Sequence, residues 1–283
     1  MLSNVKVTTL CENSAPAPSR GVMGEHGMSM LLEAGGKRIL FDTGGGLSLL
    51  HNARRLNVDL GGLDGLVLSH GHYDHTGGLK YLLEQVGSLS IYAHPDVFAD
   101  KYHLLKDEEP RRIGIPWPKE ELEHLGARFS LSRGSVKLGE EIILTGEIPR
   151  RESREENTAT DLYYKKPDGS FAPDLLADDQ AVIVESTAGT IVLLGCAHSG
   201  LINTLRYVCD LTGKKQIYAC IGGTHLMNAS NERLEYTIEA LREFDLQQVA
   251  PCHCTGPKGS LMLFQAFGDR FAHNPAGTVF NFG

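Results

Sequence analysis

Residues 66–79 read Leu-Val-Leu-Ser-His-Gly-His-Tyr-Asp-His-Thr-Gly-Gly-Leu. The stretch begins as a short apolar strand and then places three histidines and an aspartate within six residues, 70–75. Apolar residues at helical spacing follow, at 79, 82, 83 and 86. The sequence therefore predicts a strand and a helix that hold a polar, chemically active loop between them.

The residue types in this loop are those that bind a divalent transition metal. Imidazole nitrogen and carboxylate oxygen are common zinc ligands, and His70 and His72, two positions apart, can project to the same side of an extended loop. Asp74 and His75 then face elsewhere, so the loop can serve two metals, or one metal and a base. The alternative is a histidine-rich surface loop, but the chain has only twelve histidines in 283 residues, which argues against a chance cluster.

Other histidines also follow predicted strands. His198 comes after the apolar run 190–194 and precedes a helix that we expect Ser199 to cap, and His253 follows a strand at 248–251. We predict both as metal ligands. His225, after a strand at 216–221, is either a metal ligand or a substrate contact. His94 follows the strand 89–93 and is interpreted as a structural residue.

The pattern His-x-His-x-Asp-His at 70–75 resembles the signature of the metallo-β-lactamase-fold superfamily. Phe41-Asp42-Thr43-Gly44 is similar to its first motif, the segment 195–200 to its third, and Cys252-His253-Cys254 to its last histidine. The resemblance implies an α/β fold in one domain over 1–283: an αββα sandwich of two mixed β-sheets flanked by helices. It also implies one or two divalent transition metals, zinc first, with manganese or iron as alternatives, and a role for Asp42 in hydrogen bonding behind the metal loop.

Within that superfamily the chain is similar to a subgroup named for a methanopterin-pathway synthase, which joins a dihydropterin to a ribofuranosyl-aminobenzene phosphate. The similar segments are 25–29, 178–181, 222–226 and 251–256. The resemblance implies substrate contacts by Glu25, His26, Asp179 and Thr224. One departure stands out, because no aspartate lies between Asp210 and Asp245, where many superfamily members carry an aspartate that bridges two metals.

Two metal positions of unequal affinity are therefore expected. The first consists of His70, His72 and His198. The second consists of Asp74, His75 and His253, with His225 near it, and it has fewer anionic ligands than a site that includes the bridging aspartate. Cys252 and Cys254 flank His253 and are either soft donors or packing residues.

Composition limits the partners. A net charge of −8 argues against a protein that holds nucleic acid by counterion release, and no apolar run approaches the length of a membrane span. The N-terminus lacks a signal-peptide core and the six cysteines are scattered, so we expect a cytoplasmic protein with reduced thiols. The sequence leaves the oligomeric state open.

Three segments depart from a minimal fold and are expected to select a small-molecule substrate, either phosphorylated or pterin-like. They are the loop 12–28, a cap-like insertion at about 96–135 and an excursion at about 150–180. Arg111 and Arg112 in the insertion bind phosphate or form a solvated surface.

Three functions follow as hypotheses. The first is a metal-dependent hydrolase of a small ester or phosphoester, in which Asp74 orients the attacking water or accepts its proton. The second is a transferase of the synthase type, in which the metal activates a diphosphate leaving group. The third is a non-catalytic metal-containing ligand-binding protein, although a complete ligand set argues against it.

Overall fold

The computed structural model describes residues 1–16, 21–155 and 161–283. Its first large sheet has seven strands in the order β17-β1-β2-β3-β4-β5-β8. The pairs from β17 to β3 are antiparallel and those from β3 to β8 are parallel, so the sheet is mixed. The strands are β1 (Val5–Cys11), β2 (Ser29–Ala34), β3 (Lys37–Phe41), β4 (Gly65–Val67), β5 (Leu89–Ala93), β8 (Ala127–Leu131) and β17 (Val279–Phe282).

The second large sheet has six strands in the order β16-β15-β14-β13-β10-β9. β14, β15 and β16 are parallel, and the remaining pairs are antiparallel. The strands are β9 (Val136–Lys137), β10 (Ile142–Leu144), β13 (Ala181–Ser186), β14 (Gly189–Leu194), β15 (Ala219–Gly223) and β16 (Gln248–Cys252).

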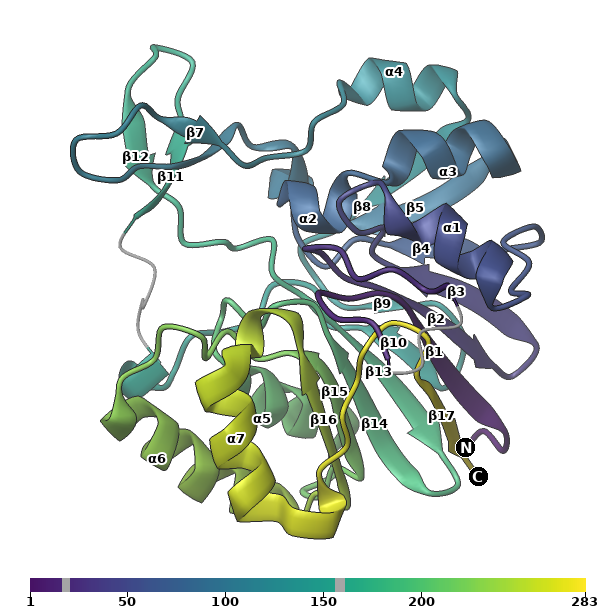
Figure 1. Cartoon of the computed structure of the whole chain (residues 1–283), viewed down its shortest axis with the longest axis vertical. Coiled ribbons are helices and arrows are strands. Elements are labelled where there is room, and N and C mark those ends of the chain that lie inside the picture. The colour runs from purple at the N-terminus through teal and green to yellow at the C-terminus, as the bar shows by residue number, and fades with distance from the viewer. Residues whose placement is uncertain (17–20, 156–160) are drawn as a thin grey trace.

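Helices cover the outer face of each sheet (Figure 1). α1 (Ser48–Arg55), α3 (Leu79–Val86) and α4 (Lys119–His124) pack on the first sheet, and α5 (Leu201–Thr212), α6 (Asn231–Leu241) and α7 (Gly256–Phe267) pack on the second. The short helix α2 (Tyr73–Thr76) lies in the metal loop. The 3₁₀ turns are η1 (Pro95–Phe98), η2 (Ser153–Glu155), η3 (Arg242–Phe244), η4 (His253–Thr255) and η5 (Gly268–Arg270). Sequence reasoning missed α1.

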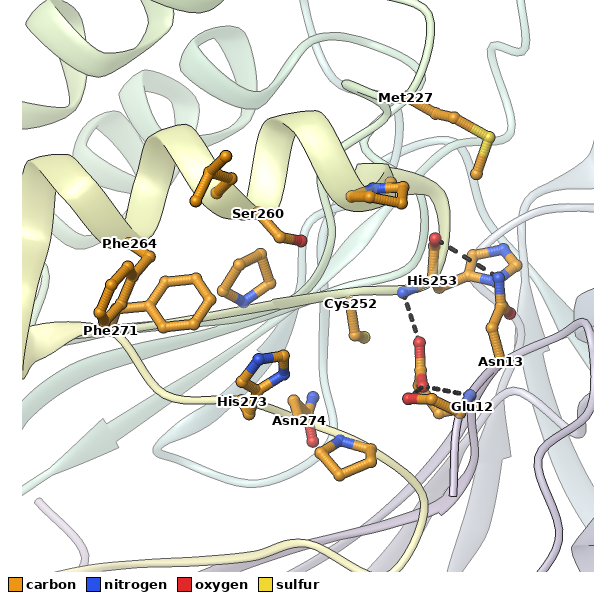
Figure 2. Close-up of a pocket in the computed structure, with 16 residues that line it drawn as sticks. Glu12, Asn13, Met227, Cys252, His253, Ser260, Phe264, Phe271, His273 and Asn274 are labelled. Atoms are coloured by element: carbon orange, nitrogen blue, oxygen red, sulfur yellow. Dashed lines mark hydrogen bonds between the residues drawn. The ribbon is translucent and has the colours of Figure 1, made fainter. Parts of the chain in front are cut away.

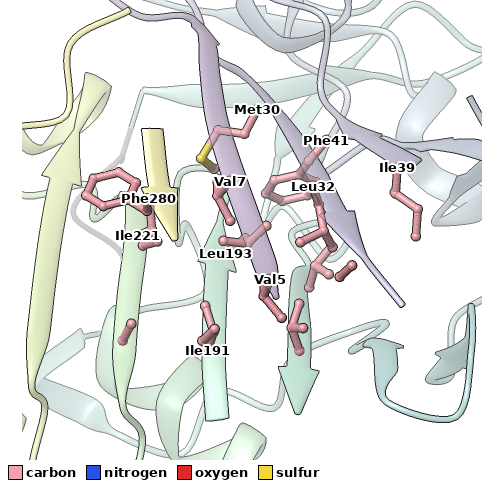
Figure 3. Packing of buried hydrophobic residues seen from close by; sticks show 14 of the residues in the cluster. Val5, Val7, Met30, Leu32, Ile39, Phe41, Ile191, Leu193, Ile221 and Phe280 are labelled. Atoms are coloured by element: carbon pink, nitrogen blue, oxygen red, sulfur yellow. The ribbon is translucent and has the colours of Figure 1, made fainter. Parts of the chain in front are cut away.

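Three apolar layers hold the sandwich together. In β2, Met30 and Leu32 point into the core between the two sheets, whereas Leu31 points into the core beneath α1, α3 and α4. Figure 3 shows the central layer, in which Val5 and Phe41 of the first sheet face Leu193 of the second. Because side chains alternate across a strand, one apolar run serves two cores, and each fully buried large side chain contributes about 1.5–3 kcal/mol. These layers confirm the predicted αββα architecture.

The insertion and the excursion pair with each other in one small sheet, which projects from the sandwich (Figure 1). Its order is β12-β11-β6-β7, and its strands are β6 (Lys101–His103), β7 (Arg111–Arg112), β11 (Leu162–Lys165) and β12 (Phe171–Pro173). The insertion also ends earlier than predicted. α4 and β8 belong to the main sandwich, because Leu122 and Ala127 are buried in the apolar cluster between the first sheet and its helices, and β8 pairs with β5.

A buried ion cluster ties the small sheet to the metal loop. Lys101, only 1% exposed, donates from Nζ to Asp174 (2.8 Å) and to Asp178 (2.9 Å), and Asp178 also accepts from the backbone N–H of Gly71 (2.7 Å). Burial alone would lower the pKa of the Lys101 ammonium, but the two carboxylates outweigh it and raise that pKa. The cluster therefore holds a charged lysine and fixes the backbone between His70 and His72.

A serine caps α6, whereas the predicted cap of α5 is wrong. Ser230 caps α6 by accepting from the N–H of Arg233 (3.1 Å). Ser199 does not cap α5, whose N-cap residue is Gly200. The first turn of α5 instead donates to the carboxylate of Glu155, from Ile202 (3.0 Å) and Asn203 (2.8 Å). That acceptor lies more than forty positions earlier in the sequence, so local pattern could not identify it.

Over the three described ranges, the helices are all too short or too polar to cross a bilayer.

Candidate metal centre

The predicted metal ligands meet at one edge of the two sheets. The metal loop follows β4, and the loops after the parallel strands β14, β15 and β16 carry His198, His225 and His253. Parallel strands bring their carboxyl ends to the same edge, which explains why residues far apart in sequence converge. All seven predicted ligands lie there: His70, His72, Asp74, His75, His198, His225 and His253.

His70, His72 and His198 form a first group. One ring nitrogen from each lies within 4.8 Å of the others, and His70 Nε2 lies 3.0 Å from His72 Nδ1. Burial lowers the pKa of His70 and His198 well below its usual value, and lowers that of His72 to about 3. All three imidazoles are therefore neutral at physiological pH, the form that binds a metal.

Asp74 and His253 form a second group with His75 and His26. Asp74 Oδ2 lies 3.2 Å from His253 Nε2 and 3.3 Å from His26 Nε2, and His75 Nε2 lies 3.2 Å from His253 Nε2. Burial would raise the pKa of Asp74, but the charge of His75 and hydrogen bonds from His253 and His26 hold it well below its usual value. His26, predicted as a substrate contact, thus also lies in ligand position.

Neighbouring acceptors decide which nitrogen of each imidazole faces the cluster. His75 Nδ1 donates to Asp42 Oδ2 (2.7 Å), and His253 Nδ1 donates to Asn13 Oδ1 (2.9 Å). Ser69 gives its hydroxyl proton to Asp42 (2.6 Å), so it accepts from His70 Nδ1 (2.9 Å). In all three rings Nε2 is therefore the nitrogen that faces the cluster and would bind a metal, as second-shell hydrogen bonds arrange for metal-binding histidines.

Asp42 lies behind the metal loop and accepts hydrogen bonds from two of its residues. Its backbone adopts a positive φ of 63°, and its two carboxylate oxygens accept from the backbone N–H of Ser69 (2.7 Å), the Ser69 hydroxyl and His75. Burial would lower the pKa of His75, but Asp42 and Asp74 raise it to about 9. The two carboxylates thus favour a positive charge at this point, and a bound cation supplies one.

The residues fit a divalent metal ion on two further observations. The Nε2 atom of His198 and the Nδ1 atom of His225 are buried without a hydrogen-bond partner, although buried polar atoms are normally paired. The nitrogen–nitrogen distances of 3.0 and 3.2 Å are close to the edge of about 3.3 Å that two nitrogens share in a tetrahedral zinc site. The donors are therefore arranged as a metal requires.

The ring of His225 lies beside the first group. Its ring is 4.2 Å from that of His198, and its backbone N–H donates to Cys254 Sγ (3.2 Å). Its backbone has a positive φ of 50°, which turns the side chain back toward His198. The ring of His225 therefore lies beside the first group while its backbone contacts Cys254, and the turn after β15 that sets this placement was not visible in the sequence.

A cavity of about 290 Å³ opens over both groups. The small sheet supplies part of its wall, through His103, Arg111 and Leu162. A larger cavity of about 770 Å³ is lined by residues of α7 and of the loop 12–14, and Figure 2 shows Phe264 and Phe271 at one end and Asn13 at the other. His253 and Met227 line both cavities.

Three residues predicted to contact substrate do not line the smaller cavity. Glu25 accepts from the backbone N–H groups of Leu47 (2.9 Å) and Ser48 (2.7 Å) at the start of α1. Asp179 accepts from the N–H of Ser199 (2.8 Å), and Thr224 bonds the hydroxyl of Thr255 (2.8 Å). Burial is the largest influence on the Asp179 carboxyl group and raises its pKa to about 6. These contacts hold loops in place.

Known proteins that resemble this chain identify its family. The family model of the metallo-beta-lactamase superfamily matches residues 23–142. A relative from Methanocaldococcus jannaschii, 7,8-dihydropterin-6-methyl-4-(beta-D-ribofuranosyl)-aminobenzene-5'-phosphate synthase, is 33% identical over 99% of this chain and 98% of its own length. The chain belongs to the metallo-beta-lactamase superfamily.

Two further proteins are similar to this chain over most of its length. An uncharacterized protein of the same organism is 34% identical over 88% of this chain and 91% of its own length. A solved structure, described as a metal-dependent hydrolase of the beta-lactamase superfamily, is 28% identical, has a TM-score of 0.82 and covers 98% of each chain. Membership of the metallo-beta-lactamase superfamily implies that the protein binds a divalent metal, for which the clustered histidines are the candidate ligands.

Sequence reasoning overlooked three residues around this metallo-beta-lactamase site: Glu12, Asn13 and Cys196. Glu12, 4% exposed, accepts from the backbone N–H of His253 (2.8 Å), and Asn13 sets the tautomer of its ring. Cys196 and Cys254 line the cavity beside the histidines. Cys254 was noted as a possible donor, whereas Glu12 and Asn13 lie in a loop about 240 positions away and carry no local signal.

The two adjacent residues Glu25 and His26 are expected to behave differently. Replacing Glu25 with Ala should lower the free energy of unfolding by about 1–2 kcal/mol, because two N–H groups at the start of α1 lose their acceptor. Replacing His26 with Ala should change it by less than about 0.5 kcal/mol, since its side chain is 57% exposed. Urea unfolding of the metal-free variants measures both, and equal losses would contradict this division.

Proposed function

We propose that the protein is a metal-dependent hydrolase of a small-molecule ester or phosphoester. The observation that carries the proposal is that neutral imidazoles with unpartnered nitrogens and the ionised carboxylate of Asp74 open into one cavity. A cavity of about 290 Å³ suits one small substrate or the reacting part of a larger one.

Different residues of the chain would hold the two metal ions and orient the attacking water. His70, His72 and His198 would hold a first metal ion, and Asp74, His75 and His253 a second. When bound, a divalent cation polarises an ester or phosphoryl oxygen and lowers the pKa of a water molecule. Asp74 keeps its carboxylate ionised at the cavity surface, so it can accept a hydrogen bond from the attacking water and orient it.

The position of Arg111 supports the proposal that the substrate carries a phosphate group. Its side chain lines the cavity, its guanidinium lies 5.8 Å from the ring centre of Tyr73, and its Nη2 donates to the Tyr73 hydroxyl (3.3 Å). A guanidinium binds phosphate oxygens by charge-assisted hydrogen bonds. Arg112, by contrast, is paired with Asp100 (2.8 Å) and does not line this cavity.

A second candidate is a synthase that joins a dihydropterin to a phosphorylated aminobenzene. The 33% identity to the Methanocaldococcus jannaschii synthase, over nearly the whole of both chains, favours it. The pair of cavities that share His253 and Met227 supports it too, because a joining reaction needs room for two molecules. In this reaction an amine or carbon nucleophile replaces water.

One set of assays tests both candidates. Protein loaded with zinc, manganese or iron is given a panel of small esters, phosphomonoesters and phosphodiesters, and separately a pterin diphosphate with and without an aminobenzene acceptor. Hydrolysis of a panel member without acceptor is the expected result. Diphosphate release only with the acceptor would overturn the hydrolase in favour of the synthase, and no turnover in either assay would overturn both. The variant His124→Ala, which changes an exposed histidine on α4, serves as the control.

A further inference from the structure

We propose that Cys196 and Cys254 are thiolate ligands of the second metal position. That position would then be a mixed site of carboxylate, imidazole and thiolate, formed by Asp74, His75 and His253 with the two sulfurs. The inference rests on the metal centre of the proposed function, but it does not depend on which bond the enzyme cleaves.

The sulfur positions fit this assignment. Cys196 Sγ lies 3.2 Å from His75 Nε2. The sulfurs of Cys196 and Cys254 and a ring nitrogen of His253 all lie within 4.8 Å of one another. With metal–nitrogen bonds of about 2.0–2.1 Å and metal–sulfur bonds of about 2.3 Å, ligands in neighbouring coordination positions lie about 3–4 Å apart. The donors are therefore near enough to share one ion after small side-chain movements.

The end of β15 leaves space for one of these sulfurs. A Cβ atom at Gly223 would lie 2.7 Å from Cys254 Sγ and 2.4 Å from the carbonyl oxygen of Gly195, so no side chain fits there. The chain has no acidic residue between Asp210 and Glu232, and thus none at this strand end. The sulfur of Cys254 occupies the position that a side chain on Gly223 would take, and a thiolate there supplies a negative charge that the strand itself lacks.

The surroundings favour sulfur as a ligand. The backbone N–H of His225 donates to Cys254 Sγ (3.2 Å), a contact that orients the sulfur and stabilises negative charge on it. Cys196 is only 3% exposed, and both residues line the cavity that Asp74 lines. The other four cysteines, at 11, 209, 220 and 252, do not line this cavity.

Cobalt titration of the whole protein, without substrate, tests the proposal. Cobalt(II) bound to thiolate absorbs in the near ultraviolet, whereas cobalt bound only to nitrogen and oxygen lacks this band. The wild-type protein should develop the band as the weaker equivalent of cobalt binds. Cys254→Ser should lose about half of the band, and the double variant with Cys196→Ser should lose all of it. In the double variant the affinity for the weaker equivalent of cobalt should fall at least about tenfold. Cys209→Ser, on α5 away from the cavity, should keep the band.

A measurement on the unmodified sequence guards against variants that fail to fold. Alkylation followed by mass spectrometry should label Cys254 in metal-free protein and leave it unlabelled after metal loading. Cobalt binding without the band, or equal labelling in both states, would overturn thiolate ligation while leaving the metal centre intact. A protein that binds no cobalt would refute the metal centre, and with it the proposed function.

Discussion

A variant in which His70, His72 and His198 are all replaced by Ala is expected to lose the more tightly bound metal equivalent and to turn over substrate at least about a thousandfold more slowly. Three neutral nitrogen ligands are removed, and the Lewis acid they hold contributes several kcal/mol to the transition state, where about 4 kcal/mol corresponds to a factor of a thousand. Metal analysis of the purified protein and steady-state kinetics measure the two effects.

His94→Ala provides a matched control for the packing that such substitutions remove. His94 is also a buried histidine at a strand end, 1% exposed, but its Nδ1 accepts from the N–H of Asp96 (3.1 Å), outside the metal centre. The control should lose stability and keep its metal. A triple variant with unaltered metal content would show that the first group of histidines does not form the principal site.

Replacing Asp74 with Asn should lower turnover by about a hundredfold to ten-thousandfold while the first metal equivalent stays bound. The substitution keeps the size of the side chain but removes the negative charge beside His26 and His253, so the second metal binds more weakly and the attacking water loses its acceptor. Kinetics at saturating metal separates these two losses. Added metal restores binding of the second ion, but it does not restore the acceptor for the attacking water.

Asp96→Asn tests whether loss of any carboxylate has the same effect. Asp96 is partly exposed, pairs with Arg133 (2.8 Å) in the turn after β5 and does not line the cavity, so its substitution should leave kcat unchanged. If Asp74→Asn retained full kcat at saturating metal, Asp74 would have no role in the chemical step, and the acceptor of the proton would have to be sought elsewhere in the cavity.

The parts of the site that sequence could predict are those whose chemistry is local. His70, His72, Asp74 and His75 lie in one loop, and His198 and His253 each directly follow an apolar strand. A strand that ends in a histidine points that residue at the edge of the sheet, so the convergence of these ligands follows from the parallel arrangement of the strands.

The parts that sequence could not predict depend on contacts between distant segments. The small sheet forms because β6 pairs with β11, about sixty residues later, and neither strand is apolar enough to be recognised alone. Glu25 was assigned to substrate from its motif, yet its carboxylate caps α1, a helix that the sequence did not reveal. Cys254 meets Cys196 and His225 only after β14, β15 and β16 have assembled.

The most direct test of the central claim, that the histidine cluster holds the metal ion on which activity depends, is turnover before and after removal of that ion. Protein stripped with a chelator and dialysed should have no measurable activity, and titration with zinc, manganese or iron should restore it in step with the metal bound, in two unequal stages. Full activity in protein shown by elemental analysis to be free of metal would contradict the account.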